Sequence, residues 1–551
     1  MNASSSPTLR PYQRDAIAAV IAARKEGVKR MEVCLPTGAG KTVIFSHLAS
    51  MARRQVLVLA HREELLGQAR DKLQSALGGA RVVAIEQGEL RAPREADVVV
   101  CSIRSLHERR LAQVMQGRDV GLIIYDECHH AAADDNLRVL RQLGVFEDDW
   151  PGTLLGFTAT TGRGDGKGLD GVFESIVYTR TLPEMIDDGF LVPLRGFRVE
   201  TRADLTRVGG GGADFDEEEL AEAVDIQERN ALVARAIQEL ARDRRTIAFC
   251  VTIAHAKNLG RALNALGVPT GIVHGTMAPD ARAAALLAFR EGRCQVLTNV
   301  GVLTEGFDDP GVGCVAMARP TRSEGLYAQC VGRGTRLAEG KRDCLILDFV
   351  DLGGLSLCTL PSLFGAPRDM DLRGEDANEA RKAWEQLRMD FPDFVLEAGA
   401  LSLGEIQERA ASFDPLTQKP QAEVRAISRH DWFSLGRHGI GLHVEMRPGQ
   451  IAEFLVLKRV ARGKTWEVSL DGTVKERFST IEEAVQAVDY EVERRGRAVV
   501  LSAMAGADWR RRPAPPGDET AASRLAAARR PVSLADALRL AAWRRVHTQG
   551  S

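Results

Sequence analysis

The chain has 551 residues, enough for three or four domains, and its 44% hydrophobic and 27% charged residues are typical of globular proteins with large buried cores. The formal net charge of −2 excludes a uniformly basic protein, although such an average can hide one basic face. The first eleven residues lack the apolar segment of a signal peptide, and the longest apolar runs are too short to cross a bilayer. We therefore expect a cytoplasmic, nucleoid-associated protein without a membrane partner.

Apolar, β-rich segments alternate with helical patterns over the first 160 residues, and we predict strands at 31–35, 56–60, 82–85, 98–102, 122–126 and 154–158. Their apolar runs are unbroken, which favours strands buried on both faces of a parallel sheet. The rhythm restarts after a glycine run at 209–212 and an acidic stretch at 214–219, with strands predicted at 246–251, 271–274, 295–298, 313–317 and 344–349. The predicted fold class is therefore α/β, with two successive parallel-sheet lobes.

After the second lobe the pattern changes, and we expect a smaller α+β C-terminal region. Short alternating strands are predicted at 454–460 and 465–470, with a turn at Asp471-Gly472 and an amphipathic helix at 481–495. We divide the chain into five parts: lobe one at 1–193, lobe two at 194–355, a helical connector at 356–428, a strand-rich accessory domain at 429–500 and an arginine-rich tail at 501–551.

A phosphate-binding loop is predicted at residues 35–42, whose sequence Leu-Pro-Thr-Gly-Ala-Gly-Lys-Thr follows a strand and opens a helix. Backbone N–H groups of such a loop cradle phosphate oxygens at a helix N-terminus. The strict G-x-x-x-x-G-K-T pattern fails at Leu35, but the form P-T-G-x-G-K-T is fully matched. We expect the cradle to comprise Thr37, Gly38, Ala39 and Gly40, with Lys41 reaching the β/γ-phosphates and Thr42 binding Mg²⁺.

The sequence Tyr-Asp-Glu-Cys-His at 125–129 closes another apolar strand. A carboxylate at the C-terminal end of a parallel strand lies at the ligand crevice of such a sheet. Asp126 is predicted to hold Mg²⁺, and Glu127 to position and deprotonate the attacking water, while His129 faces the neighbouring lobe or the segment at 158–160. A lone acidic pair is usually a solvated turn, but the phosphate loop makes ATP hydrolysis the better interpretation.

This set of motifs resembles the superfamily 2 helicases of the DExH type over about residues 8–351. The resemblance implies two RecA-like lobes with ATP and Mg²⁺ as cofactors. Residues 9–13 look like the adenine-reading motif, implying contacts from Arg10 and Gln13. Residues 59–65 and 102–106 resemble motifs Ia and Ib, which grip a strand backbone and imply nucleic-acid contacts from Arg62 and Ser102.

The remaining motifs resemble those of the same family. Thr158-Ala159-Thr160 resembles motif III, although Thr161 stands where a proline usually follows. Residues 249–257 resemble motif IV, and the sequence at 302–308 resembles motif V, which implies nucleotide contacts from Gly306 and Asp308 and a nucleic-acid contact from Thr298 in the same lobe. Q-x-x-G-R-x-x-R at 329–336 matches motif VI, which implies arginine fingers at Arg333 and Arg336.

Within the superfamily, residues 9–13, 57–64, 126–130 and 318–321 are most similar to the XPB-like and RadD-like branch of bacterial DNA repair helicases. This chain has no cysteine beyond Cys358, so the zinc segment common in RadD-like proteins is missing. The resemblance implies an ATP-dependent DNA helicase or translocase in repair or recombination. Its expected partners are single-stranded, duplex or forked DNA, together with single-strand-binding or repair proteins.

Three alternatives stand beside this interpretation. The motor could act on RNA, the less expected partner, because the motifs serve both nucleic acids. It could be the motor subunit of a restriction-type assembly whose partner cleaves. A non-catalytic clamp is disfavoured, because such a clamp has no use for Glu127, Lys41, Arg333 and Arg336.

Metal sites and the tail complete the sequence analysis. Nine scattered cysteines without a C-x-x-C pair argue against a zinc ribbon, so we expect no zinc and interpret His430, His438 and His443 as packing or surface residues. From Trp509 onward, nine arginines face only three acids, with Trp543 among them. These residues could bind phosphates and stack on bases, or form a solvated helix with its tryptophans packed inward.

Overall fold

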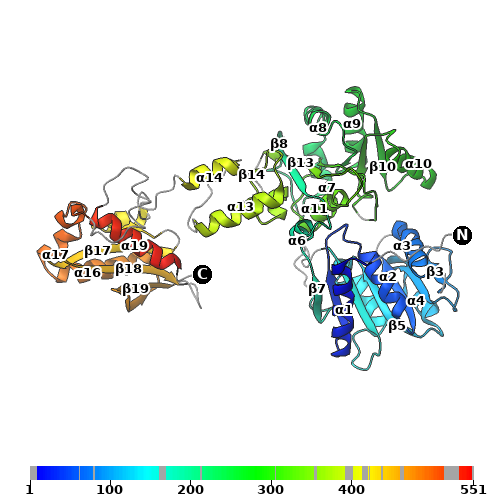
Figure 1. Cartoon of the computed structure of the whole chain (residues 1–551), viewed down its shortest axis with the longest axis horizontal. Helices are drawn as coiled ribbons and strands as arrows, with labels where there is room; N and C mark the ends of the chain where they lie inside the picture. The colour runs from blue at the N-terminus through cyan, green and yellow to red at the C-terminus, as the bar shows by residue number, and fades with distance from the viewer. Residues whose placement is uncertain are drawn as a thin grey trace. The chain divides into compact units, whose positions relative to one another are not determined.

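The computed structural model describes residues 9–60, 63–78, 81–159, 169–210, 214–304, 306–352, 357–390, 401–411, 420, 422–435, 438–459, 465–513 and 533–548 (Figure 1). The chain divides into two compact units, one comprising 1–384 with 398–403 and the other 385–397 with 404–551. Among the described residues, no helix combines the length and apolar character needed to cross a membrane.

Lobe one of the first unit is built on a seven-stranded, fully parallel sheet in the order β3-β4-β2-β5-β6-β1-β7. Its strands are β1 (Arg30–Cys34), β2 (Gln55–Ala60), β3 (Val83–Glu86), β4 (Val98–Ser102), β5 (Val120–Asp126), β6 (Thr153–Thr158) and β7 (Ser175–Thr179). The six predicted strands are confirmed. The sequence missed β7, because this edge strand is half-exposed and its short sequence carries no unbroken apolar run.

The helices of lobe one connect these strands as parallel pairing requires. They are α1 (Pro11–Lys25), α2 (Lys41–Met51), α3 (Glu63–Ala76), α4 (Glu108–Met115) and α5 (Asp134–Gln142). The interior strands contribute fully buried side chains such as Leu59, Tyr125 and Leu154 to one core cluster. The phosphate loop and the acidic pair leave this sheet at the carboxyl ends of β1 and β5.

Lobe two has a six-stranded parallel sheet in the order β10-β11-β9-β12-β13-β8. Its strands are β8 (Leu194–Asp204), β9 (Thr246–Phe249), β10 (Thr270–His274), β11 (Val296–Val300), β12 (Cys314–Met317) and β13 (Cys344–Leu352), and its helices are α7 (Glu217–Val224), α8 (Gln227–Leu240), α9 (Ile253–Ala265), α10 (Pro279–Arg290) and α11 (Glu324–Val331). The two parallel-sheet α/β lobes confirm the predicted fold class. Edge strand β8 was missed because its residues alternate in burial.

A buried ion pair joins α8 to β13 in lobe two. The guanidinium of Arg229 donates two hydrogen bonds to the Asp351 carboxylate, with N–O distances of 2.8 and 2.9 Å, and both side chains are almost fully buried. Removing one partner of such a pair strongly destabilises the fold, because the other partner is left as an uncompensated buried charge. The pair therefore fixes α8 against the last strand of the sheet.

The predicted glycine turn before α7 is only partly described, because residues 211–213 lie outside the described residues. Asp216 caps the helix that follows by accepting hydrogen bonds from the backbone N–H groups of Glu218 and Glu219. The predicted helix is therefore present at the acidic stretch.

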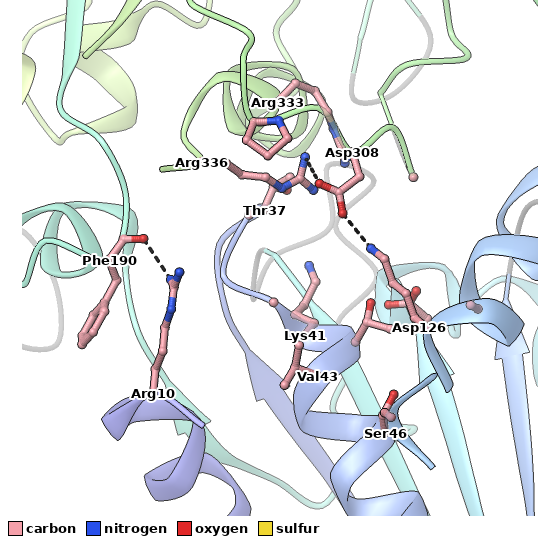
Figure 2. Close-up of a pocket in the computed structure, with 18 of the residues that line it drawn as sticks. Arg10, Thr37, Lys41, Val43, Ser46, Asp126, Phe190, Asp308, Arg333 and Arg336 are labelled. Carbon is pink, nitrogen blue, oxygen red and sulfur yellow. Dashed lines mark hydrogen bonds and ion pairs between the residues drawn. The ribbon is translucent and has the colours of Figure 1, made fainter. Parts of the chain in front are cut away.

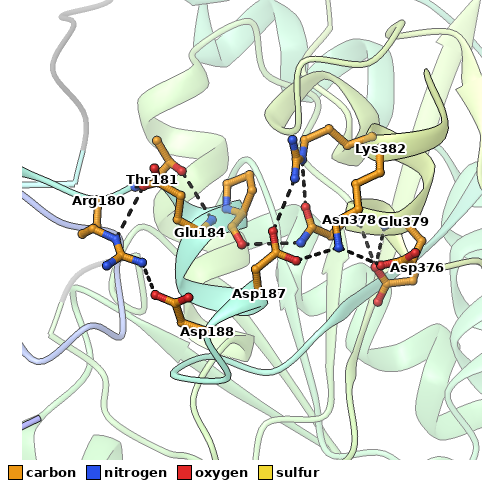
Figure 3. Close-up of polar contacts among 11 residues, drawn as sticks. Arg180, Thr181, Glu184, Asp187, Asp188, Asp376, Asn378, Glu379 and Lys382 are labelled. Carbon is orange, nitrogen blue, oxygen red and sulfur yellow. Dashed lines mark hydrogen bonds and ion pairs between the residues drawn. The ribbon is translucent and has the colours of Figure 1, made fainter. Parts of the chain in front are cut away.

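Helix α6 (Leu182–Asp187) lies in the chain between β7 of lobe one and β8 of lobe two. The first turns of α13 (Ala377–Asp390) contact it, as Figure 3 shows. The Lys382 ammonium lies 2.8 Å from one oxygen of Asp187 and the Arg381 guanidinium 3.4 Å from the other, while the Asn378 amide donates to the carbonyl of Pro183. The helix that follows lobe two is thus bound to the crossover between the lobes.

The smaller elements of the connector are α12 (Leu360–Leu363), α14 (Leu403–Ala411) and α15 (Ala422–Ile427), together with a two-stranded parallel pair, β14 (Met370–Asp371) and β15 (Leu401–Ser402). The antiparallel bridge between Arg195 and Asp376 extends the edge of the lobe-two sheet beyond β8. This bridge fixes the start of α13 against lobe two.

The second unit contains a five-stranded antiparallel meander, followed by helices. Its elements are β16 (Phe433–Ser434), β17 (Gly439–Arg447), β18 (Gln450–Arg459), β19 (Thr465–Leu470), β20 (Thr473–Phe478), α16 (Ile481–Arg494), α17 (Arg497–Ser502) and α19 (Leu534–Thr548). Because neighbouring side chains of a strand point to opposite faces, Phe454 and Val456 pack under α16 while Leu455 contacts Ala542 of α19. The predicted turn at Asp471-Gly472 is confirmed, with positive φ angles of 49° and 77° that suit a tight hairpin.

Residues of the arginine-rich tail pack into this unit. Trp509 is 1% exposed, and its indole N–H donates to the carbonyl of Ser502. Arg510 is buried beside it and pairs with Asp431, while Arg512 and Arg545 pair with Glu445 and Glu453. The inward-packing interpretation therefore holds for Trp509; Arg524, Arg529, Arg530 and the side chains of Trp543 and Arg544 lie outside the described residues.

Candidate nucleotide-binding site

The phosphate loop leaves β1 after Cys34 and enters α2 at Lys41. Gly38 and Gly40 have φ angles of +91° and +74°, a left-handed conformation that side chains disfavour. A Cβ at Gly38 would lie 2.7 Å from the Thr335 hydroxyl oxygen, and one at Gly40 would lie 2.9 Å from the Gln13 amide nitrogen. Glycine is therefore required at both positions by conformation and by close contact.

The carboxylate of Glu127 lies beside the lysine of this loop. The Lys41 ammonium is 3.5 Å from an oxygen of Glu127, and both side chains are about 10% exposed. Burial by itself would raise the pKa of Glu127, but Lys41, His129 and Arg333 favour the charged form and bring the pKa well below its ordinary value. The second carboxylate oxygen is buried and lies 3.4 Å from the Nδ1 atom of His129.

His129 connects this carboxylate to the other lobe. Its Nδ1 atom lies 3.4 Å from Glu127 and 3.4 Å from the Thr158 hydroxyl, and its Nε2 atom lies 3.5 Å from the amide nitrogen of Gln329. Thr158 and Gln329 belong to the segments that resemble motifs III and VI. The side chain therefore faces both predicted neighbours; Thr160 and Thr161 lie outside the described residues.

Lobe two completes the cavity with two arginines (Figure 2). The buried Arg333 donates to the carbonyl of Phe307 at 2.9 Å, and Arg336 donates to the same carbonyl at 3.1 Å. Gly306 and Asp308 also line this cavity of about 520 Å³, together with Lys41, Thr42, Asp126 and Glu127 of lobe one. The site is thus assembled from both lobes.

The residues present fit a magnesium ion held with substrate phosphates. Thr42 and Asp126 both line the cavity and offer hydroxyl and carboxylate oxygens, which are the donors that Mg²⁺ prefers. Among the described residues, no group of three or more His, Cys, Asp and Glu side chains could hold a metal by itself. Two protein oxygens suffice for Mg²⁺ because nucleotide phosphates and water supply its other ligands.

The segment that resembles the adenine-reading motif reaches the cavity through Arg10. The Gln13 side-chain oxygen accepts from the backbone N–H of Arg10, and the Arg10 guanidinium donates to the carbonyl of Phe190 at 3.2 Å. The ring of Phe190 lies 4.7 Å from that of Tyr12, whose hydroxyl donates to the carbonyl of Ala39 in the phosphate loop. Sequence analysis missed Phe190, because it belongs to the crossover between the lobes and to no motif.

Two of the residues proposed to contact nucleic acid are buried and cannot reach a nucleic-acid strand in this conformation. Ser102 and Thr298 are 0% exposed, and the Thr298 hydroxyl donates to the carbonyl of Gly271. Arg62 lies outside the described residues. The structure therefore gathers the predicted nucleotide-site residues but buries the side chains of Ser102 and Thr298.

Histidines of the second unit have separate partners. The His430 Nδ1 atom lies 2.8 Å from Asp489, and the His443 Nε2 atom lies 3.1 Å from Glu453. Both rings are buried. These contacts are those of packed histidines.

Two parallel-sheet lobes thus enclose the predicted phosphate loop, the buried Glu127 carboxylate and two facing arginines, an arrangement suited to ATP hydrolysis. Residues 6–163 match the family "Type III restriction enzyme, res subunit", and residues 228–338 match "Helicase conserved C-terminal domain". The two lobes are accordingly those of a superfamily 2 helicase.

Known proteins resemble the chain over both lobes. A mitochondrial protein of Schizosaccharomyces pombe named as the ATP-dependent helicase irc3 is 37% identical over 369 residues, which cover 66% of this chain and 60% of that protein. A Saccharomyces cerevisiae protein named as the ATP-dependent helicase IRC3 is 34% identical over 387 residues, covering 68% and 56%. The chain thus spans less than two thirds of the length of these two relatives.

A solved fragment assigned to the HsdR subunit of a type I restriction enzyme from Vibrio vulnificus YJ016 is 27% identical. Its TM-score is 0.48, and the match covers 62% of this chain and 65% of that fragment.

Proposed function

We propose that the protein is an ATP-dependent DNA helicase or translocase of the XPB-like and RadD-like kind, acting in repair or recombination. One observation carries the motor function: Lys41 and Glu127 of lobe one share a cavity with Arg333 and Arg336 of lobe two. A nucleotide bound there contacts both lobes, so its hydrolysis alters the free energy of the closed arrangement. The residues on each lobe that contact the nucleic-acid strand then move relative to those on the other lobe.

The chemistry follows from the charges around the cavity. Glu127 is ionised, so it can orient a water molecule and accept its proton as the oxygen attacks the γ-phosphoryl group. Lys41, Arg333 and Arg336 offer positive charge where the transition state gathers negative charge on the phosphoryl oxygens. Bound Mg²⁺ would neutralise further phosphate charge at Thr42 and Asp126.

The choice of DNA rests on the resemblance of residues 9–13, 57–64, 126–130 and 318–321 to DNA repair helicases. An RNA helicase is the first alternative, because contacts to phosphate and sugar position a strand without reading its sequence. A motor subunit of a restriction-type assembly is the second, favoured by the family description that matches residues 6–163.

Single-strand-binding or repair proteins are proposed as protein partners, and the cytoplasmic nucleoid as the location. Arg62, Ser102 and Thr298 remain proposed strand contacts. Because the Ser102 and Thr298 hydroxyls are buried, their contacts require a rearrangement when nucleic acid binds. The five-part division with boundaries near 193, 355, 428 and 500 is proposed as the functional organisation.

The test compares ATP hydrolysis with single-stranded DNA, duplex DNA, forked DNA and RNA of matched length. We expect strong stimulation by at least one DNA and little by RNA. Glu127→Gln provides the control for contaminating ATPases, because it removes the proposed base. Stimulation by RNA alone would replace the DNA proposal with the RNA alternative, and no stimulation by any nucleic acid would overturn the motor function.

A further inference from the structure

Asp308 of lobe two holds two cations, one from each lobe (Figure 2). The Lys72 ammonium of α3 lies 2.7 Å from one carboxylate oxygen, and the Arg336 guanidinium lies 3.1 Å from the other. Lys72 belongs to none of the motifs that the sequence presents, yet it lines the same cavity as Lys41 and Glu127. The carboxylate therefore links lobe one to the arginine finger proposed for catalysis.

All three groups are charged. Burial by itself would raise the pKa of Asp308, but Arg336, Lys72 and Arg333 lower it below its ordinary value. Arg336 is thus held by a full negative charge and by the Phe307 carbonyl. Both contacts use the Nη1 atom of Arg336, so a phosphoryl group bound by this same atom takes the place of Asp308.

We propose that Lys72 is a positioning residue that lets Arg336 leave Asp308 for the phosphoryl group during ATP hydrolysis. The inference rests on the proposed function, since it concerns the same cavity. When Arg336 moves, Lys72 remains as the counterion of Asp308. Without Lys72, that departure leaves a carboxylate unpaired next to an anionic nucleotide, and the unfavourable interaction of like charges keeps Arg336 in place.

The position of Lys72 suits this role. Its side chain is 47% exposed, so it can follow Asp308 as the lobes move, and it is far enough from the core that its replacement does not threaten folding. An isolated ion pair with this exposure contributes little to stability. The expected effect of Lys72 is therefore on the arginine finger rather than on the fold.

The experiment measures steady-state ATP hydrolysis by the full chain at saturating nucleic acid. We expect Lys72→Ala to lower kcat by roughly tenfold, a fraction of the 10³–10⁵ that an arginine finger contributes, with KM for ATP within about twofold of wild type. Lys72→Arg should restore most of kcat, because it keeps the positive charge. Arg70→Ala is the matched control, since Arg70 lies on the same helix and pairs with its neighbour Asp71.

A double-mutant cycle makes the test specific. In an Asp308→Asn background the carboxylate no longer retains Arg336, so adding Lys72→Ala should not lower kcat further. An equal loss in both backgrounds would overturn the inference, as would wild-type kcat in Lys72→Ala. A raised KM with unchanged kcat would show that Lys72 only bridges the lobes and would also overturn it. Absence of nucleic-acid-stimulated hydrolysis in the wild type would instead overturn the proposed function, and this inference with it.

Discussion

The hydroxyl of Thr335 in lobe two donates a hydrogen bond of 3.2 Å to the main-chain carbonyl of Thr37 in the phosphate loop. The two residues are 298 positions apart in the chain. At the same point, a Cβ added to Gly332 would lie 2.3 Å from the Cβ of Thr37. The phosphate loop therefore contacts the segment that carries Arg333 and Arg336. The distance between these two segments determines whether both can contact the same nucleotide.

Gly332→Ala should interfere with this contact. The new methyl group cannot fit against Thr37, so the arginines are displaced from the phosphate loop, and nucleic-acid-stimulated kcat should fall by about tenfold or more. Gly171→Ala is the matched control, because a Cβ there meets no atom within 4 Å. Equal rates in the two variants would contradict the close approach of the lobes during turnover.

Glu127→Gln should keep ATP binding and reduce turnover by at least about 10², equivalent to roughly 2.7 kcal/mol of barrier. The amide preserves the shape of the side chain but cannot accept the proton of the attacking water. Nucleotide binding followed by fluorescence, beside single-turnover hydrolysis, separates the two effects. Lys41→Ala should weaken binding as well, and wild-type hydrolysis in Glu127→Gln would exclude Glu127 as the base.

Glu32 gives a prediction for stability against pH. It is 2% exposed in β1, and one of its oxygens has no hydrogen-bond partner among the described residues. Burial, aided by Asp170, raises the pKa of Glu32 from about 4.5 to about 7. The folded state thus binds the proton more tightly than the unfolded state, so stability is lost as pH rises from 4.5 through 7.

Glu32→Gln should therefore raise Tm at pH 8 and change it little at pH 5, with a gain of at most roughly 3 kcal/mol at the higher pH. Thermal unfolding at the two pH values tests this. Glu86→Gln is the control and should instead lower Tm, because it removes the ion pair of the buried Glu86 with Arg110 at 2.7 Å. A gain from Glu32→Gln that is the same at both pH values would show that the ionised carboxylate is not its cause.

Asp351→Asn should destabilise lobe two by about 3–5 kcal/mol, because it leaves the buried Arg229 guanidinium without its counterion. Replacing both residues by apolar side chains, in Arg229→Met with Asp351→Leu, should cost less than the single change. Calorimetry on the variants provides the comparison. A double variant less stable than Asp351→Asn would show that the pair contributes net stability.

The sequence predicted every interior strand of the two parallel sheets, but of the four edge strands it predicted only β3 and β10. Interior strands such as β2 and β5 are buried on both faces, so their apolar runs are unbroken and visible in the sequence. The edge strands β7 and β8 are partly exposed and lack this signal. An apolar run therefore reveals a strand whose side chains are buried on both faces of the sheet, but it does not reveal a strand that is hydrogen-bonded yet partly exposed.

The same limit applies to the site. Residues 36–42 and 126–127 could be found because local geometry dictates their types and spacing. Phe190 and Lys72 reach the cavity only through the approach of distant segments, so no local pattern marks them. Thr298 lies on the interior strand β11, and this position buries its hydroxyl in a way that the sequence alone does not reveal.

Trp509→Ala should destabilise the second unit by about 3–5 kcal/mol, because it removes a large side chain that is 1% exposed and a hydrogen bond to Ser502. Tyr490→Ala is the control, since Tyr490 is 69% exposed on α16 of the same unit. Differential scanning calorimetry measures both. Unchanged melting in Trp509→Ala, together with weaker DNA binding, would instead favour base stacking by this tryptophan.

The contacts between α13 and α6 join the helix that follows lobe two to the crossover between the lobes. Lys382 and Asn378 bind α13 at this point, and the chain continues from α13 toward the second unit. A change in the angle between the lobes would therefore move the start of α13 together with the crossover, because these contacts join the two.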